Sequence, residues 1–286
     1  MKHFYEQIGL FSFFSSLVTN ILFNQLLLYL LKYCYNSILQ TYWIQLVTYG
    51  FSIIIIKIIY RSPFYEISSR ANFLGFCLSL GILICNSSIY IWKTFGIYVT
   101  VLSTFHFTEF LGIAFTNPAS LSFDSFVINH SPAYTLAAIA SWTEFGTRVY
   151  FFPNMKPNLC LLVIGTIFCV AGEILRKTAI FTAKQNFNHI VQSKKSNHHS
   201  LVTHGVYNVC RHPSYVGWFY WSIGTQLILH NPICLLAYII ISWKFFEDRI
   251  FIEELSLVEF YGDAYKIYQN NVGTGLPFIS GYIDAN

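Results

Sequence analysis

The chain has 286 residues, of which 55% are hydrophobic, 19% are aromatic and only 10% are charged. Soluble domains carry about 25% charged residues, so this composition argues against a soluble protein and indicates a membrane protein. The formal net charge of +4 is small and dispersed along the chain, which argues against nucleic-acid binding.

Long apolar stretches predict an all-α integral membrane protein with about eight transmembrane helices. A helix that spans a bilayer needs about 20 mostly apolar residues. The predicted spans are residues 10–31, 39–60, 72–92, 95–116, 131–152, 158–179, 214–229 and 232–246. The last two are short and are separated only by His230-Asn231-Pro232, so we expect them to form a tight helical hairpin.

Basic residues indicate how these spans are oriented. The connection between residues 176 and 211 is rich in lysine and arginine, and more charge follows Lys244. Because loops rich in basic residues face the cytosol, we expect both segments and the N-terminus there. Lys32, Lys93 and Lys156 then fall on the opposite face.

The domain organisation predicted is a single membrane domain over residues 1–286. Residues 1–175 are mainly transmembrane helices. Residues 176–286 supply a polar connector, the hairpin and an amphipathic tail, and we expect the functional site in this last part.

Residues 204–226, HGVYNVCRHPSYVGWFYWSIGTQ, place ionisable groups directly against an apolar helix. Polar groups near lipid are costly unless they bind something, so Arg211 and His212 indicate a site. Pro213 suits the first turn of the helix, whose positive dipole end could receive an anionic group. The alternative is an interfacial loop whose basic side chains extend into water.

The tail after Lys244 carries a second group of charges. Arg249 and Glu253 are four residues apart and share a helix face, and Glu254 follows directly. One interpretation is an amphipathic helix that lies on the membrane. The other is a site in which Glu253 binds a hydroxyl or amine of a cofactor while Arg249 binds an anionic substrate.

Some polar residues lie within the predicted spans, where unpaired charge is costly. They occur at helical spacing, so each set can form a local structural pair. Arg176 also lies at the cytosolic end of its helix and is therefore a candidate functional residue. The sets are His106 with Glu109, Glu144 with Arg148, and Glu173 with Arg176 and Lys177.

No metal site is expected. The seven cysteines are scattered singly through apolar segments, without metal-ligand spacing. His198 and His199 are adjacent, so they would point apart on a helix, and no carboxylate is close to them in the sequence.

Several motifs together resemble the isoprenylcysteine carboxyl methyltransferase family. RHPSYVGWFYWSIGTQ (211–226) and the Glu253-Glu254 pair with its following aromatic residues carry most of this resemblance. NHSPAYTLAAIASWTEF (129–145), LRKTAIFTAKQNFNHIVQ (175–192) and TGLPFISG (274–281) agree with it. The RHPxYxG pattern alone is less specific, because phospholipid methyltransferases and related sterol reductases share it.

The resemblance implies an enzyme of the endoplasmic reticulum that uses S-adenosylmethionine. Its expected substrate is the C-terminal carboxylate of farnesylated or geranylgeranylated cysteine in processed proteins, bound at the cytosolic membrane face. The family's substrate contact falls on Arg249, and the position of Arg176 is linked to activity. The family's cofactor contacts fall on Gln192, His199, Ser200, Leu201, Val202, Tyr207, His212, Pro213, Ser214, Tyr215 and Glu253.

The residues fit this chemistry. An α-carboxylate has a pKa of about 3.3–3.7, so it is ionised at neutral pH and needs no general base. The sequence has no GxGxxG turn after a strand, which predicts a non-Rossmann cofactor site.

Three alternatives remain open on the residues. A phospholipid N-methyltransferase would favour a carboxylate over Arg249 beside its amine acceptor. A sterol reductase would need a basic cluster for a nicotinamide phosphate, and only Arg211 is available. A small transporter would carry broken helices and charges at mid-membrane.

Overall fold

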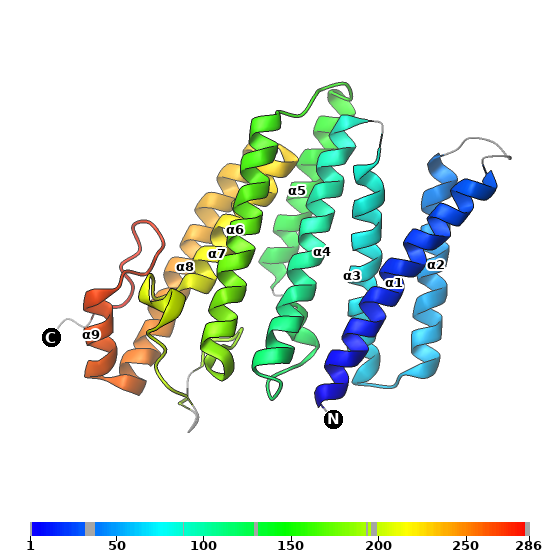
Figure 1. Cartoon of the computed structure of the whole chain (residues 1–286). Coiled ribbons are helices and arrows are strands. Elements are labelled where there is room, and N and C mark those ends of the chain that lie inside the picture. Colours follow the sequence, from blue (N-terminus) through cyan, green and yellow to red (C-terminus); the bar gives the residue numbers. More distant parts are fainter. Residues whose placement is uncertain are drawn as a thin grey trace. The chain divides into compact units, whose positions relative to one another are not determined.

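The computed structural model describes residues 2–31, 38–87, 89–128, 131–192, 194–195 and 199–283. Within these ranges the chain forms nine α-helices and three short 3-10 helices, and no strand. The chain divides into two compact units, Met1–Ala114 with Leu121–His130 and Phe115–Ser120 with Ser131–Asn286. The first unit is the blue-to-cyan part of Figure 1, and most of the second is green to red.

The first unit is built on α1, which packs along α3, while α2 packs against both. Short polar side chains join these helices, as in the 2.6 Å hydrogen bond between the Ser12 and Ser68 hydroxyls. The elements of this unit are α1 (Lys2–Leu31), α2 (Ile38–Ile59), α3 (Phe64–Cys85), most of α4 (Tyr90–Thr116) and the 3-10 helix η1 (Phe123–Phe126).

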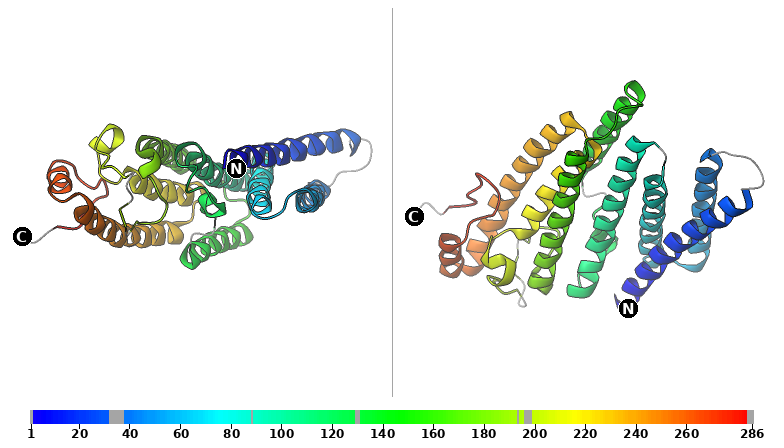
Figure 2. Two further views of the ribbon diagram at one scale, coloured as in Figure 1. Left: turned by 90° about the horizontal axis from the view of Figure 1, so that it is seen from below. Right: turned by 45° about the horizontal axis from the view of Figure 1, so that its top comes forward.

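The second unit contains four long helices, of which α6, α7 and α8 lie side by side in both views of Figure 2. The connector between α6 and α7 lies at one end of these helices, where α8 also ends and α9 follows. The elements are α5 (Pro132–Phe151), α6 (Leu159–Ala183), η2 (Lys184–Asn186), η3 (Gly205–Asn208), α7 (Pro213–Leu229), α8 (Pro232–Tyr261) and α9 (Asp263–Asn271).

Paired glycines bring α6 and α7 into backbone contact. A Cβ atom added to Gly172 would lie 2.4 Å from the Gly217 carbonyl oxygen, and one added to Gly165 would lie 2.8 Å from that of Gly224. The seven-residue spacing on both helices repeats this contact after two turns. Small residues that let backbones approach are typical of helix pairs in membranes.

The turn between α7 and α8 is held by two charged side chains of α5. The Glu144 carboxylate accepts hydrogen bonds from the backbone N–H groups of Ile233 at 2.9 Å and Cys234 at 2.7 Å, which caps the start of α8. Arg148 donates to the carbonyl of Leu229 at the end of α7. Glu144 and Arg148 thus both bind the turn between α7 and α8, instead of forming the local pair that their spacing predicts.

The other polar sets have different outcomes. Glu173 and Lys177 form the expected ion pair, with 3.2 Å between carboxylate oxygen and ammonium nitrogen. The Nδ1 atom of His106 lies 3.0 Å from the carbonyl oxygen of Phe126, so this histidine contacts the loop after α4.

Helix bounds differ from the predicted spans where polar residues enter a helix. α3 begins directly after Pro63, and its early residues Ile67, Ser68 and Asn72 are buried within the first unit. α8 has 30 residues, longer than predicted, since no glycine or proline interrupts it before Gly262. The predicted amphipathic tail thus forms the second half of α8 and the following α9.

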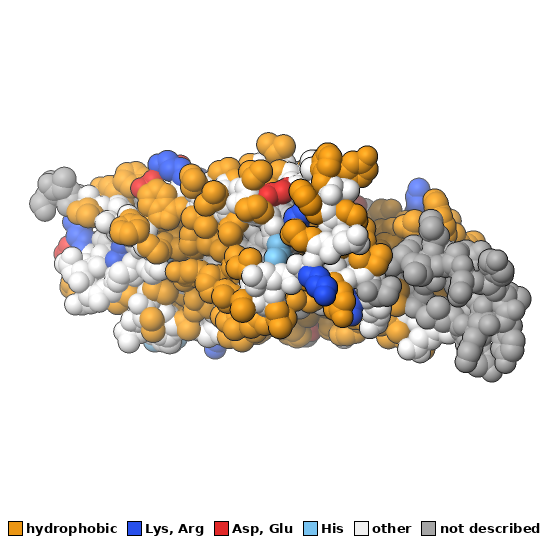
Figure 3. All heavy atoms as spheres, turned by 90° about the horizontal axis from the view of Figure 1, so that it is seen from above, with side chains coloured by type: hydrophobic (Ala, Val, Ile, Leu, Met, Phe, Trp, Pro, Cys, Tyr) orange, Lys and Arg blue, Asp and Glu red, His pale blue; other side chains and the backbone are white. Residues whose placement is uncertain are grey.

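Among the residues that the structure describes, four helical segments are long and apolar enough to cross a membrane: Phe4–Phe23, Phe64–Cys85, Tyr90–Thr116 and Leu159–Asn186. Large apolar side chains are exposed along them; Ile167, Val170 and Ile174 of α6 share one exposed face. Figure 3 shows hydrophobic side chains over much of the face that it draws. Such a surface indicates an integral membrane protein.

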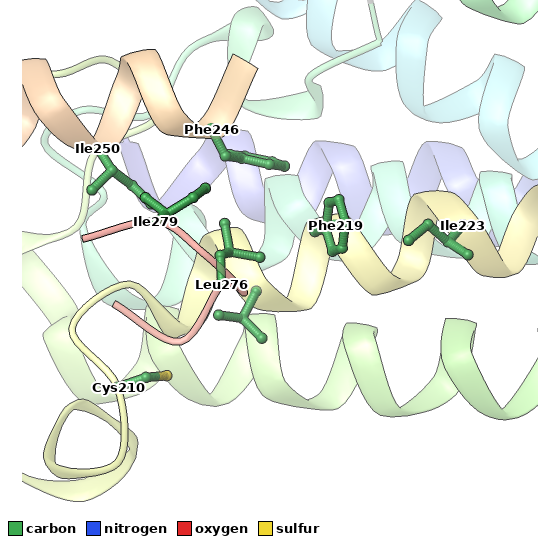
Figure 4. Close-up of a cluster of buried hydrophobic side chains, with 8 residues drawn as sticks. Cys210, Phe219, Ile223, Phe246, Ile250, Leu276 and Ile279 are labelled. Carbon is green, nitrogen blue, oxygen red and sulfur yellow. The ribbon is translucent and has the colours of Figure 1, made fainter. Parts of the chain in front are cut away.

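The C-terminal segment packs onto α7 and α8 through a buried apolar cluster (Figure 4). Phe219 and Ile223 come from α7, Phe246 and Ile250 from α8. The cluster is completed by Cys210, Val216, Leu276 and Ile279. Because residues beyond α9 are part of this core, the C-terminal segment is an integral part of the second unit.

The glycine contact gives a first prediction. Gly172→Ala places a methyl group against the α7 backbone and should force the two helices apart, costing about 1–3 kcal/mol. The expected result is a lower Tm for the purified protein in detergent, measured by a thermal shift assay.

The matched control is Gly146→Ala on α5, where an added Cβ meets nothing within 4 Å. This change should leave Tm unchanged or raise it slightly, because alanine favours helix over glycine. Equal Tm values for the two variants would contradict the close-contact explanation.

Candidate active site

A pocket lies where the connector, the start of α7, the second half of α8 and α9 meet. It encloses about 990 Å³, including the open solvent at its mouth. All eleven predicted cofactor residues line it: Gln192, His199, Ser200, Leu201, Val202, Tyr207, His212, Pro213, Ser214, Tyr215 and Glu253. Segments more than 60 positions apart in the sequence therefore contribute to one cavity.

The connector wall is held in place by hydrogen bonds of its own backbone. The Asn186 side chain accepts from the backbone N–H of Ser200 at 2.8 Å and so closes the loop between them. The Tyr268 hydroxyl of α9 donates to the carbonyl of Tyr207 at 2.5 Å. These contacts give the irregular connector a defined shape on either side of residues 196–198. Those three residues, which include the His198 considered above, lie outside the described residues.

A buried ion pair forms part of the pocket wall, with Arg211 in the lining and Glu254 behind it. The Arg211 Nε atom donates to the Glu254 carboxylate at 2.7 Å, and Nε2 of His212 lies 2.9 Å from the same oxygen. The Glu254 side chain is fully buried. A buried carboxylate is stable only when its oxygens are hydrogen-bonded and its charge is paired, and both conditions are met here.

The same pair ties the C-terminal segment to the site. The second Glu254 oxygen accepts from the Gln269 side chain at 3.1 Å and from the Tyr282 N–H at 2.9 Å. Arg211 also donates to the carbonyls of Gln269 at 3.1 Å and Ser280 at 2.9 Å. The tail passes so close to this carboxylate that a Cβ at Gly281, whose φ is +82°, would lie 1.9 Å from it.

These contacts set the protonation of Glu254. Burial opposes its charge, but the hydrogen bond and charge of His212 and those of Arg211 outweigh burial and lower the pKa of Glu254 to about 2. The carboxylate is therefore ionised across the physiological range.

Tyr215 connects the two charged residues that face the pocket region from α8. Its hydroxyl donates to Glu253 Oε2 at 2.5 Å and accepts from Arg249 Nε at 2.9 Å. Arg249 also donates through Nη2 to the carbonyl of His189 at 2.5 Å. Arg249 does not line the pocket itself but lies directly behind Tyr215, which does.

Arg176 is buried at the end of α6 and supports the start of α7. Its Nη1 atom donates to the Ser214 hydroxyl at 2.7 Å and to the Ser214 carbonyl at 3.3 Å. Its guanidinium lies over the Trp218 ring, 4.6 Å from the centroid. It is not among the pocket-lining residues, so the contacts described here hold Ser214 in the pocket wall rather than reach a ligand.

Sequence reasoning did not assign a role to Glu254 or to the α9 tyrosines, although it noted all of them. Glu254 makes four side-chain hydrogen bonds, and Tyr265 and Tyr268 line the pocket. The Glu253-Glu254 pair could have indicated a role for Glu254. Side chains of adjacent helix residues point in different directions, so when Glu253 faces the pocket, Glu254 faces the core.

The lining suits S-adenosylmethionine, a sulfonium that also carries an ammonium, a carboxylate and an adenosine. Glu253 offers a carboxylate to a cationic or hydroxyl group, and the Gln192 amide can donate and accept. Tyr207 and Tyr261 offer aromatic faces, which attract cations and stack on bases. The few polar groups among apolar walls are typical of sites for small molecules.

The lining is poorly suited to a nucleotide with an added phosphate. Arg211 is the basic side chain that a sterol reductase would use, and it is fully occupied by Glu254 and three backbone carbonyls. Among the described residues there is also no group of three or more His, Cys, Asp or Glu side chains that could hold a metal ion.

The exposed apolar helices and the pocket at their ends define an integral membrane protein with a small-molecule site. Residues 163–259 match the model of the "Isoprenylcysteine carboxyl methyltransferase (ICMT) family". The chain is 55% identical over 227 residues to protein-S-isoprenylcysteine O-methyltransferase of Tribolium castaneum, covering 79% of this chain and 81% of that protein. It is 52% identical to the Homo sapiens protein of the same name over 227 residues, or 79% and 80% of the two chains.

A solved structure agrees with these similarities. The structure of a eukaryotic intramembrane Ras methyltransferase, also called isoprenylcysteine carboxyl methyltransferase, superposes with a TM-score of 0.93 at 47% identity, covering 98% of this chain and 99% of that one. The chain belongs to the isoprenylcysteine carboxyl methyltransferase family, which confirms the resemblance noted in its motifs, and it is a membrane methyltransferase.

The buried ion pair gives a second prediction. Glu254→Gln leaves Arg211 buried without its counter-charge, a change that typically costs about 3–5 kcal/mol. The Tm of the protein in detergent at pH 7 should fall by about 10 °C. Glu259→Gln, an exposed change on the same helix, is the control and should leave Tm unchanged.

The pH dependence follows from the lowered pKa of Glu254. A group whose folded pKa lies below its unfolded value stabilises the folded state above the unfolded pKa, and this stabilisation is lost as pH falls through the folded pKa. The contribution of Glu254, about 3 kcal/mol, should be complete above pH 5 and decline between pH 5 and 2. The Tm difference between wild type and Glu254→Gln should therefore shrink over this interval; a constant difference would contradict the assignment.

Proposed function

We propose that the protein transfers a methyl group from S-adenosylmethionine to the C-terminal carboxylate of prenylated cysteine in processed proteins. The observation that carries the proposal is the convergence of the eleven family-matched cofactor positions on one pocket, with Arg249 beside it. Its relatives' names state the same acceptor. The site belongs to residues 176–286 of what we propose is a single functional domain.

Each set of residues has a separate task. S-adenosylmethionine, when bound, supplies a methyl group on a positively charged sulfur. The pocket lining and Glu253 hold its polar groups, and Arg249 orients the acceptor carboxylate, since a guanidinium matches a carboxylate geometrically. Alignment of the two reactants can contribute about 7–11 kcal/mol to lowering the barrier, so positioning alone accounts for much of the catalysis.

No general base is required. The acceptor is already an anion at neutral pH. His212, a histidine of the pocket lining, has its Nε2 atom against Glu254 and its ring stacked on Tyr215, with 5.5 Å between centroids. We assign His212 to holding the pocket wall.

The membrane location suits the proposed substrate. Each buried CH₂ of a lipid chain contributes about 0.8 kcal/mol, so a prenyl tail favours the bilayer while its carboxylate stays at the surface. The aromatic side chains Trp218, Phe245 and Phe246 lie next to the α7–α8 site and offer an apolar wall for that tail. We propose the endoplasmic reticulum membrane with eight crossings and a cytosolic site, which the basic connector supports.

The direct test is methyl transfer by the purified protein in lipid. Labelled S-adenosylmethionine is offered with N-acetyl-S-farnesylcysteine, and in parallel with phosphatidylethanolamine. Base-labile label on farnesylcysteine is the expected result, because the product is an ester. Label on phosphatidylethanolamine alone would overturn the acceptor and favour a phospholipid N-methyltransferase.

Arg249→Lys tests the guanidinium. Lysine keeps the charge but cannot replace a planar fork that binds two groups at once. The expected result is a loss of roughly tenfold or more in kcat/KM for farnesylcysteine. Arg61→Lys, at an exposed position, is the control, and near-wild-type activity of Arg249→Lys would contradict the role of the fork.

The absence of a base gives a further prediction. Between pH 6 and 8 the rate of the folded enzyme at saturating substrates should change by less than about threefold, since no group must lose a proton for the reaction. A tenfold fall toward pH 6 that disappears in a His212 variant would assign that histidine a proton-transfer role.

A further inference from the structure

Arg249 and Glu253 are opposite charges on one face of α8, yet they do not contact each other directly. At four residues apart, such side chains are neighbours on the helix and can form an ion pair. Instead the Tyr215 hydroxyl lies between them, accepting from Arg249 Nε at 2.9 Å and donating to Glu253 Oε2 at 2.5 Å. A neutral phenol thus separates two charges that would otherwise neutralise each other.

The hydroxyl also fixes the direction of Arg249. The guanidinium is anchored at two points, Nε on Tyr215 and Nη2 on the His189 carbonyl. Its carbon lies 5.5 Å from the centre of the Tyr215 ring. Among the described residues Nη1 has no hydrogen-bond partner, so an end of the fork is left for an anion.

The ring of Tyr215 is held independently of its hydroxyl. It stacks on His212, with 5.5 Å between centroids and 4° between planes, and on Phe246 at 5.3 Å and 28°. Phenylalanine at this position would keep both ring contacts. The hydroxyl can therefore be removed without removing the wall that the ring provides.

We propose that the Tyr215 hydroxyl is a positioning group for the acceptor. It orients Arg249 toward the substrate carboxylate and keeps that guanidinium from pairing with Glu253, which is left for the methyl donor. This inference rests on the proposed function and goes beyond a contact with the donor, because it gives the hydroxyl a role in acceptor binding. Without the hydroxyl, Arg249 and Glu253 form a direct ion pair, and the guanidinium is then no longer available to the substrate carboxylate.

The test is Tyr215→Phe in the full-length protein in lipid. The kcat/KM for N-acetyl-S-farnesylcysteine should fall about 10- to 100-fold, the size of effect expected from a misplaced positioning group. The affinity for S-adenosylhomocysteine, measured by calorimetric titration of the same preparation, should change by less than about threefold. The ring and the other lining residues remain, and a Glu253 carboxylate paired with Arg249 through one oxygen still offers its second oxygen to the donor. The titration also shows that the variant is folded.

The matched control is Tyr220→Phe, the same chemical change five residues further along α7, where the hydroxyl makes no hydrogen bond within the described part of the chain. Its acceptor kcat/KM should stay within about twofold of wild type, as for a surface or unpaired substitution.

A double-mutant cycle tests whether Tyr215 acts through Arg249. In an Arg249→Lys background the added Tyr215→Phe change should cost less than about threefold, since the group it positions is already gone. An equal cost in both backgrounds would overturn the proposal, as would wild-type acceptor kinetics in Tyr215→Phe. A loss of S-adenosylhomocysteine affinity as large as the loss in acceptor kcat/KM would reduce Tyr215 to a donor contact and also overturn it. A wild-type protein that does not esterify farnesylcysteine would instead overturn the proposed function itself.

Discussion

The ion pair between Arg211 and Glu254 is the contact on which the site depends. It joins Arg211, two residues before α7, to the second half of α8, and the remaining hydrogen bonds of the pair reach α9 and the C-terminal segment. Three walls of the pocket are therefore fixed by one buried carboxylate. Desolvating such a pair is expensive, so its presence in a mostly apolar protein is more readily explained by the need to specify this arrangement than by gross stability.

A second constraint places α7 relative to α6. The glycine pairs let the two backbones touch, and Arg176 of α6 then reaches the Ser214 hydroxyl. The start of α7 is fixed on one side by Arg176 and on the other by Arg211, and from there the Tyr215 side chain points toward α8. The polar site is thus positioned by helix packing on one flank and by charge pairing on the other.

Sequence reasoning found the helices and the pocket residues for different reasons. Hydrophobic length indicates a membrane helix directly, so α6 and α7 were expected close to where they lie. The eleven pocket positions came from a resemblance, and physics alone left open whether Arg249 and Glu253 face lipid or a ligand. The partners of Glu144 and Glu254 could not be inferred, because both bind groups from other elements, and spacing along one helix says nothing about those.

The way charges are separated explains how a weak nucleophile can be used at a membrane surface. A guanidinium that paired with a protein carboxylate would be unavailable to a substrate, and in a poorly solvated region such pairing is favoured strongly. This is the situation of Arg211, which Glu254 binds permanently and which is therefore structural. Tyr215 does the opposite for Arg249, holding it near Glu253 without neutralising it. Two arginines at one pocket thus differ in role because their hydrogen-bond partners differ. Arg211 binds a buried carboxylate, whereas Arg249 binds a phenol.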